Sequence, residues 1–169
     1  MEKVKAFCKR KNIEISVKRY LIDALGAMAQ GLFASLLIGT IISTLGTQLN
    51  IPILVTVGTY AKAAVGPAMA IAIGYALQAA PLVLFSLAAV GAAANELGGA
   101  GGPLAVLVVA IFAAELGKAV SKETKIDIIV TPFVTIFVGV ALSIWWAPAI
   151  GAAAVSYTHL RAHETKANL

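Results

Sequence analysis

The chain has 169 residues, of which 60% are hydrophobic and only 12% are charged. Soluble domains carry about 25% charged residues, so this composition excludes an ordinary soluble enzyme, a disordered tail and a nucleic-acid-binding module. The single cysteine excludes a disulfide-stapled scaffold, and the 15 glycines show no collagen-like period. The remaining class is an integral membrane protein.

The basic residues are concentrated at the N-terminus. Seven of the 13 lie in residues 1–19 and are opposed only by Glu2 and Glu14, which leaves this segment with a net charge of +5. A second charged cluster covers residues 118–127. Because lysine and arginine beside apolar spans mark the cytoplasmic side, we predict that both clusters are cytoplasmic. Residues 1–19 form either a basic amphipathic helix on the membrane surface or a solvated leader.

Apolar runs divided by glycine, proline and charged turns predict the spans, in chain order. The first covers residues 24–45, which is long enough to cross a bilayer. Along it a small residue recurs at every fourth position, which predicts close packing with another helix. These residues are Ala27, Gly31, Ser35, Gly39 and Ser43. Residues 53–62 are apolar but short, and either lie at the outer interface or continue into the next span.

Three shorter spans are predicted at residues 63–77, 82–97 and 104–117. A fifth starts at residue 126 and ends near Trp146, with a bend expected at Pro132. Thr124 and Asp127 have the spacing of a capping box at its start. Four crossings between the basic clusters return the chain to the same side, and one pair of short spans could instead form a re-entrant hairpin. The predicted fold class is therefore all-α, a polytopic transmembrane helix bundle of about five spans.

The sequence changes character after Ala154. Residues 155–165, VSYTHLRAHET, resemble the translation of a sequencing adapter, so we expect residues 155–169 to be a non-native tail and the natural protein to be longer. His159 and His163 both lie in this tail. Their spacing would suit a metal ion, but the adapter resemblance argues against a metal site.

Five strings carry a resemblance to a known family. They are residues 18–42, GTYA at 58–61, PLVLFS at 81–86, GGAGGP at 98–103 and VSKETKIDIIVTP at 120–132. Together they resemble the N-terminal half of the bacterial phosphotransferase system (PTS) enzyme IIC-like membrane family, over about residues 10–154. These strings form packing surfaces and loops, so they indicate the family better than they indicate a site.

The resemblance implies that residues 20–154 form part of an EIIC-like transmembrane domain in a bacterial plasma membrane, with the N-terminus cytoplasmic. Such a permease subunit translocates a sugar that a partner IIB subunit phosphorylates. The implied partners are the sugar, the IIB and IIA subunits, the lipid bilayer and, at full length, a second copy of the chain. We expect no catalytic residue, cofactor or metal here. An ion-coupled secondary transporter and a non-transporting scaffold or regulatory subunit are the alternatives.

Three polar residues near the ends of spans are the candidate substrate-binding residues: Asn95, Glu96 and Glu115. Ionisable groups inside spans are costly and usually face a cavity or a partner, and carboxylates and amides together offer acceptors and donors to sugar hydroxyls. The alternatives are that Glu96 is a loop-end residue in water and that Glu115 pairs with Lys118.

Two other ionisable residues lie within or beside the spans. For Asp23 we predict a salt bridge with Arg19 or an interaction with the helix dipole at the start of the first span. For Lys62 we predict that the side chain extends to the outer interface.

Overall fold

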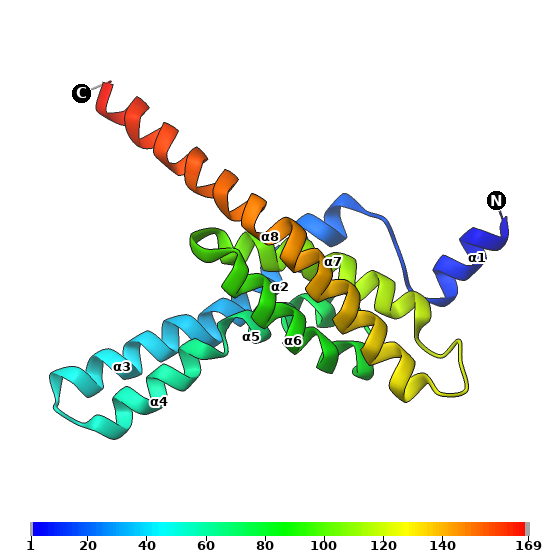
Figure 1. The fold of residues 1–169 in the computed structure, drawn as a ribbon, viewed down its shortest axis with the longest axis horizontal. Coiled ribbons are helices and arrows are strands. Elements are labelled where there is room, and N and C mark those ends of the chain that lie inside the picture. The colour runs from blue at the N-terminus through cyan, green and yellow to red at the C-terminus, as the bar shows by residue number, and fades with distance from the viewer. Residues whose placement is uncertain (1, 168–169) are drawn as a thin grey trace.

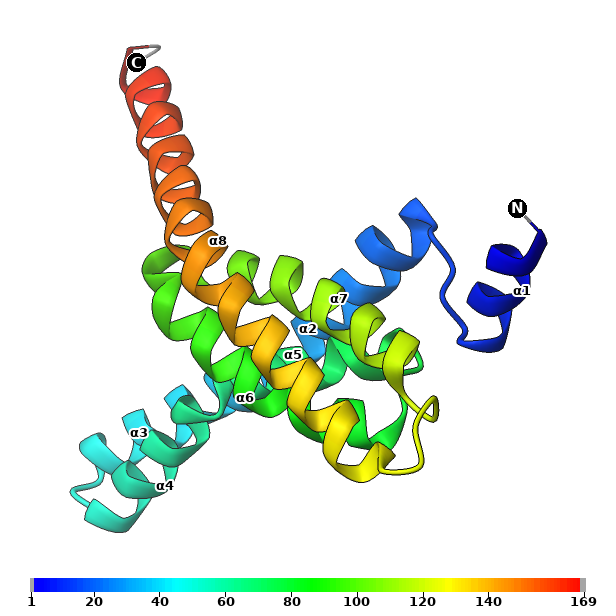
Figure 2. The same cartoon turned by 45° about the vertical axis from the view of Figure 1, so that its right-hand side comes forward.

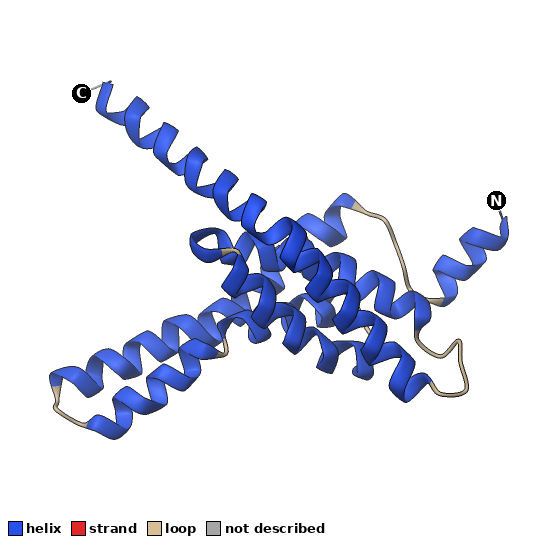
Figure 3. Ribbon diagram, in the orientation of Figure 1, coloured by secondary structure: helices blue, strands red, loops and turns tan. Residues whose placement is uncertain are grey.

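The computed structural model describes residues 2–167, with side chains up to residue 157, and every regular element within these residues is a helix (Figure 3). A short helix, α1 (Glu2–Arg10), precedes the bundle. Residues 155–167 continue the last helix, and His159 and His163 lie outside the residues whose side chains are described.

The first span is longer than predicted. One continuous helix covers Lys18–Gln48, a length of 31 residues. It consists of η1 (Lys18–Asp23), α2 (Ala24–Leu32), η2 (Phe33–Leu37) and α3 (Ile38–Gln48), of which η1 and η2 have π-helical hydrogen bonding. At 1.5 Å per residue it measures about 46 Å, against about 30 Å for the hydrocarbon core of a bilayer.

Residues 53–62 belong to a helix that leads into the next span. The chain turns at residues 49–51, Pro52 occupies the first turn of α4 (Pro52–Ala63), and α4 packs antiparallel to α3. A bend of 46° then separates α4 from α5 (Val65–Ala76). The α3–α4 hairpin projects from the rest of the bundle (Figures 1 and 2).

The remaining helices are α6 (Pro81–Leu97), the short η3 (Gly99–Gly101), α7 (Gly102–Val120) and α8 (Asp127–Ala167). By length and composition, three described helices can cross a membrane, and the bent α4–α5 pair makes a fourth. Helix α6 has 17 residues and is shorter than a typical span of about 20. The predicted number of about five thus becomes four candidate spans and one short apolar helix.

Helix α8 differs from its prediction in length and at its start. It runs on past Trp146, and its α-helical structure is unbroken at Pro132 (Figure 1). The predicted capping box does not form. Instead, the Asp127 carboxylate accepts hydrogen bonds from the Lys122 backbone N–H (2.6 Å) and the Thr131 hydroxyl (2.5 Å).

The row of small residues on the first span is a packing surface, as predicted. A Cβ added at Gly31 would lie 2.6 Å from the Ala68 carbonyl oxygen of α5, and one added at Gly58 of α4 would lie 2.6 Å from the Ser43 nitrogen. Backbones therefore approach closely at both places, which only small residues permit.

A second row of small residues, on α8, was not predicted. Its members are spaced four apart and all are buried: Thr131, Thr135, Gly139, Ser143, Ala147 and Gly151. The Thr135 and Ser143 hydroxyls each donate to the carbonyl four residues earlier, at 2.8 Å. Since these hydroxyls are satisfied within the helix, their burial against α6 and α7 leaves no polar group without a partner.

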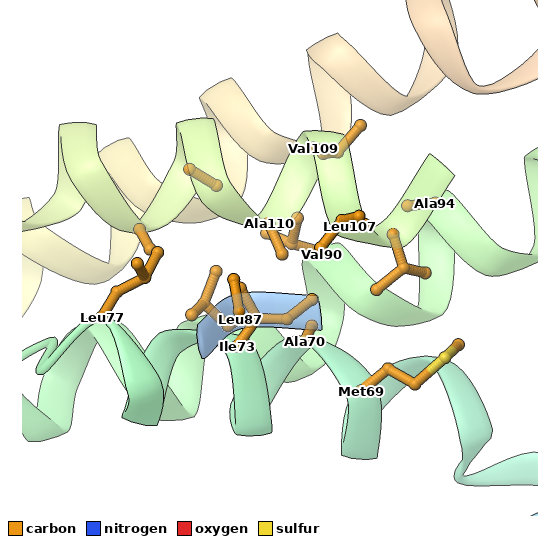
Figure 4. Packing of buried hydrophobic residues seen from close by; sticks show 14 of the residues in the cluster. Met69, Ala70, Ile73, Leu77, Leu87, Val90, Ala94, Leu107, Val109 and Ala110 are labelled. Atoms are coloured by element: carbon orange, nitrogen blue, oxygen red, sulfur yellow. The ribbon is translucent and has the colours of Figure 1, made fainter. Parts of the chain in front are cut away.

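The apolar core lies between α5, α6 and α7 (Figure 4). Met69, Ile73 and Leu77 of α5 are fully buried. They pack with Leu87 and Val90 of α6 and with a set of small and β-branched residues on α7: Val106, Val109, Ala110, Ala113 and Ala114. Helices α2 and α8 also pack on this group.

We predict that Gly91→Ala destabilises the bundle by about 1–3 kcal/mol, the usual cost of overpacking. A Cβ at Gly91 would lie 2.2 Å from the Gly66 carbonyl oxygen, so α5 and α6 would have to separate. Gly26→Ala is the matched control, because a Cβ there meets nothing within 4 Å. Thermal unfolding in detergent should show a lower melting temperature for Gly91→Ala and no decrease for Gly26→Ala. Equal melting temperatures for the two variants would contradict the close approach of α5 and α6.

Candidate functional site

Polar and charged side chains gather at one end of the bundle, where α5 and α7 end and the Lys18–Gln48 helix begins. We call this the polar end and define it by five residues linked by hydrogen bonds: Asn12, Arg19, Leu77, Gln78 and Lys118. Both predicted basic clusters contribute to it.

The centre of the polar end is the backbone carbonyl of Leu77. Helix α5 closes with Gln78 in the left-handed conformation (φ 56°), and the Ala79 and Gln78 N–H groups donate to Gly74 and Tyr75. This is a Schellman arrangement, and it leaves the Leu77 carbonyl free at the negative end of the helix dipole. Arg19 Nη2 and Lys118 Nζ both donate to this oxygen at 2.9 Å.

Both cations at this carbonyl are removed from solvent, since Arg19 is 9% exposed and Lys118 is 3% exposed. Asn12, a residue of the N-terminal segment, completes their coordination. Its backbone carbonyl accepts from Lys118 Nζ at 2.9 Å, its side-chain oxygen accepts from Arg19 at 3.4 Å, and its amide donates to the Gln78 side chain. The N-terminal segment is thereby fastened to the ends of α5 and α7.

Glu115 lies one turn before Lys118, and its carboxylate is 3.1 Å from the Lys118 ammonium. The predicted Glu115–Lys118 pairing is therefore present. The Glu115 carboxylate oxygens are buried, and Tyr20 and Lys118 are their polar neighbours. The side chain also lines an apolar cavity of about 470 Å³ that includes Tyr20 and Phe112.

A second set of contacts joins the N-terminal segment to the α7–α8 loop. The Glu123 carboxylate is 2.8 Å from Arg10 Nη2 and 2.6 Å from Lys11 Nζ. The hydrogen bond from Lys11, with the nearby charge of Arg10, lowers the pKa of the Glu123 carboxyl below its ordinary value. This pairing contributes to stability above the ordinary pKa of glutamate and is lost as the pH falls through the lowered pKa.

The polar end places the two basic clusters side by side, as the Arg10–Glu123 ion pair shows. Between them the chain passes along the bundle four times, through residues 18–48, 52–76, 81–97 and 102–120 (Figure 2). By length and composition three of these segments are candidate spans and α6 is a shorter apolar helix, so the even number of membrane crossings stays a prediction.

The structure does not bring the three candidate substrate-binding residues together. Asn95 packs against Gly102 at the opposite end of the bundle, where a Cβ on Gly102 would lie 2.7 Å from Asn95 Oδ1. Glu115 is 13 residues further along α7, which corresponds to about 20 Å. Glu96 is exposed beside Asn95. Asn95 and Glu96 therefore form one group, and Glu115 belongs to the polar end.

The predicted salt bridge between Asp23 and Arg19 does not form, and the extension of Lys62 to the outer interface stays a prediction. Arg19 pairs with Glu14 at 3.6 Å and with the Leu77 carbonyl, and the ion pairs of the described residues do not include Asp23. Lys62 is partly buried, and its ammonium lies 3.4 Å from the Ser43 hydroxyl across the α3–α4 hairpin. Both cations therefore have a polar partner within the fold.

Sequence reasoning missed Asn12, Leu77 and Gln78. A backbone carbonyl carries no side-chain signal, and Asn12 and Gln78 stand in segments that read as loop. Both residues have positive φ in the structure (55° and 56°). The one hint in the sequence is at position 12, since asparagine adopts this conformation more readily than most residues.

These features define a class: a multi-pass α-helical membrane protein whose buried charges are collected at one end of the bundle. Comparison with known families identifies the particular family. The model of the family described as "Phosphotransferase system, EIIC" matches residues 22–160. No curated protein and no solved structure gives a significant match. The chain belongs to the phosphotransferase-system EIIC family, and it is a membrane-embedded permease subunit of that kind.

We predict that Lys118→Met destabilises the protein by about 3–5 kcal/mol, because it leaves Glu115 as a buried charge without its partner. The double variant Glu115→Gln/Lys118→Met should recover part of this loss. Lys125→Met is the control, since Lys125 is exposed on the α7–α8 loop. Thermal unfolding in detergent provides the measurement, and a Lys118→Met protein as stable as the control would show that the polar end does not hold the bundle together.

Proposed function

We propose that this chain is the permease (IIC) subunit of a phosphoenolpyruvate-dependent sugar phosphotransferase system. In this function it carries a sugar across the membrane, and a partner IIB subunit, itself supplied by IIA, transfers phosphate to that sugar. The observation that carries the proposal is the family match over residues 22–160. We propose that the protein acts as a homodimer.

We further propose that the polar end faces the cytoplasm, with residues 1–19 as a basic segment on that side and residues 20–154 as the transmembrane part. The support is electrostatic. The basic residues at 3–19 and 118–125 share one end of the fold, and positively charged segments beside short loops are retained on the cytoplasmic side.

For the sugar we propose contacts at both ends of the bundle. Asn95 and Glu96 act at the outer end, and Glu115 acts at the polar end. A separation of about 20 Å along α7 is too great for one monosaccharide to bridge, so the sugar meets the two groups in succession. Glu115 has the stronger case, because its carboxylate oxygens are buried and the residue lines a cavity of about 470 Å³, where a carboxylate can accept a hydrogen bond from a sugar hydroxyl.

Sugar uptake tests the transport function. Right-side-out vesicles that hold the protein, IIB, IIA and the general phosphotransfer proteins would be loaded with phosphoenolpyruvate and offered radiolabelled monosaccharides and disaccharides. We expect one class of sugar to accumulate as its phosphate, and only in loaded vesicles. Accumulation of free sugar that follows a proton or sodium gradient would overturn the proposal in favour of a secondary transporter.

The same assay tests the site residues through Glu96→Gln and Glu115→Gln. A lost hydrogen bond to a charged group is worth about 1.5–3 kcal/mol, so we expect the KM for the sugar to rise about tenfold or more. Glu2→Gln, at the far N-terminus, serves as the control. An unchanged KM for either variant would remove that residue from the site.

The orientation can be tested with the natural cysteine. Cys8 is unpaired and partly exposed in α1, on the polar-end side. We predict that a membrane-impermeant thiol reagent labels it in inverted vesicles and leaves it unlabelled in intact cells. In a Cys8→Ser/Ala100→Cys variant the pattern should reverse, because Ala100 is exposed in the turn at the opposite end. Labelling of Cys8 from outside would contradict the proposed orientation.

A further inference from the structure

A polar cavity of about 460 Å³ lies at the polar end, between the N-terminal segment, the α5–α6 connection and the α7–α8 loop. Four cationic side chains line it: Arg10, Lys11, Lys118 and Lys122. Among the described residues that line it, Glu123 is the single carboxylate. The volume falls within the range of small-molecule sites, about 300–1,000 Å³.

The excess of positive charge is larger here than in the neighbouring cavities. A neighbouring cavity of about 310 Å³ shares Asn12 and Gln78 with it, and there Lys18 and Arg19 are balanced by Glu14 and Asp23. The Asn12–Gln78 hydrogen bond stands where the two cavities meet. The lining residues of the larger cavity sum to +3, and the pairing of Lys118 with Glu115 lowers this excess to about +2.

Within the charged cavity, Glu123 shows how an oxyanion is held. One of its carboxylate oxygens, Oε1, lies within 2.8 Å of both Arg10 Nη2 and Lys11 Nζ. The Lys11 side chain is 9% exposed, so this donor is preorganised, whereas the Glu123 side chain is 39% exposed. Glu123 stands on the non-helical loop between α7 and α8. Rotation of its side chain would withdraw its oxygen from both cations, while Lys11 Nζ keeps its hydrogen bond to the Ser121 carbonyl.

We propose that this cavity binds a phosphate monoester, whose oxygens take the place of the Glu123 carboxylate on Arg10 and Lys11, with Lys122 as a third cation. A dianion interacts with these cations more strongly than a single carboxylate does, and arginine binds phosphate oxygens in its fork geometry. Asn12 and Gln78 supply amides that can bind hydroxyls.

The identity of the ligand rests on the proposed function: at the cytoplasmic end of a sugar phosphotransferase permease it is the phosphorylated sugar that leaves the protein. Glu123 then acts as an internal competitor. It occupies the site when the phosphorylated sugar is absent, and it keeps the N-terminal segment attached to the α7–α8 loop.

The test is the binding of inorganic phosphate and of a hexose 6-phosphate to the purified full chain in detergent, by isothermal titration at constant ionic strength. Lys11→Gln and Lys122→Gln should each weaken binding of both probes about tenfold. Glu123→Gln should tighten binding several-fold, because it removes the competitor. Lys122 is exposed, so its variant tests the site without disturbing the buried contacts, and thermal unfolding checks the folding of each protein.

Two matched controls separate a built site from general electrostatics. Glu14→Gln and Lys125→Gln make the same changes of charge at the polar end, but neither residue lines the cavity. They should leave both affinities within twofold of the parent protein. Equal tightening by Glu14→Gln and Glu123→Gln, weaker binding in Glu123→Gln, or no binding of either probe would each overturn the proposal.

A lipid headgroup is the other source of a phosphate ester, and a vesicle arm distinguishes it. If Lys11→Gln and Lys122→Gln weaken association with phosphatidylglycerol vesicles but leave hexose 6-phosphate binding unchanged, the sugar-phosphate assignment is wrong. Failure of the site is also distinct from failure of the transport function. Phosphoenolpyruvate-dependent uptake without phosphate binding would contradict the proposed site alone. Phosphate binding without such uptake would contradict the transport proposal alone.

Discussion

The fold depends on one carbonyl oxygen. Leu77 ends α5 with its C=O free, and two cations from elements distant in sequence, Arg19 and Lys118, donate to it. In a membrane protein a free carbonyl and a buried cation are each costly alone. The hydrogen bonds between the carbonyl and the two cations offset both costs. They also fix the start of the long first helix relative to the ends of α5 and α7. Asn12 adds the N-terminal segment to the same point.

This arrangement also explains the charge distribution of the chain. Residues that read in the sequence as an orientation label are, in the fold, partly structural: Lys11, Arg19 and Lys118 are almost completely buried. Arg10 and Lys122 remain exposed. In a basic segment beside a membrane, some cations can therefore stabilise the helix bundle while the exposed ones are available to lipids, partners or ligands.

Much of the fold could be predicted from sequence, because apolar runs, prolines and glycine-rich turns mark helix boundaries directly. The small-residue row from Ala27 to Ser43 predicted close packing, and the structure has it. The row from Thr131 to Gly151 was missed because two threonines and a serine read as polar positions, although their hydroxyls bond within the helix. In the site, the spacing of Glu115 and Lys118 was enough to predict their pairing. The role of Leu77 could not be predicted, since its contribution comes from the backbone. The separation of Asn95 from Glu115 could not be predicted either, because it depends on the two residues lying at opposite ends of antiparallel helices.

The row on α8 also determines where that helix goes. A step of four residues advances about 40° beyond a full turn, so five steps from Thr131 to Gly151 carry the buried stripe about halfway around the helix. A straight helix can keep such a stripe in contact only by crossing its neighbours obliquely, as ridges of this spacing do. Its contacts accordingly shift from Gly117 beside Thr135, through Val90 beside Gly139, to Gly98 beside Gly151. Helix α8 thus crosses the other helices obliquely from the polar end to the turn at Gly98, and beyond this turn it projects from the bundle (Figure 1).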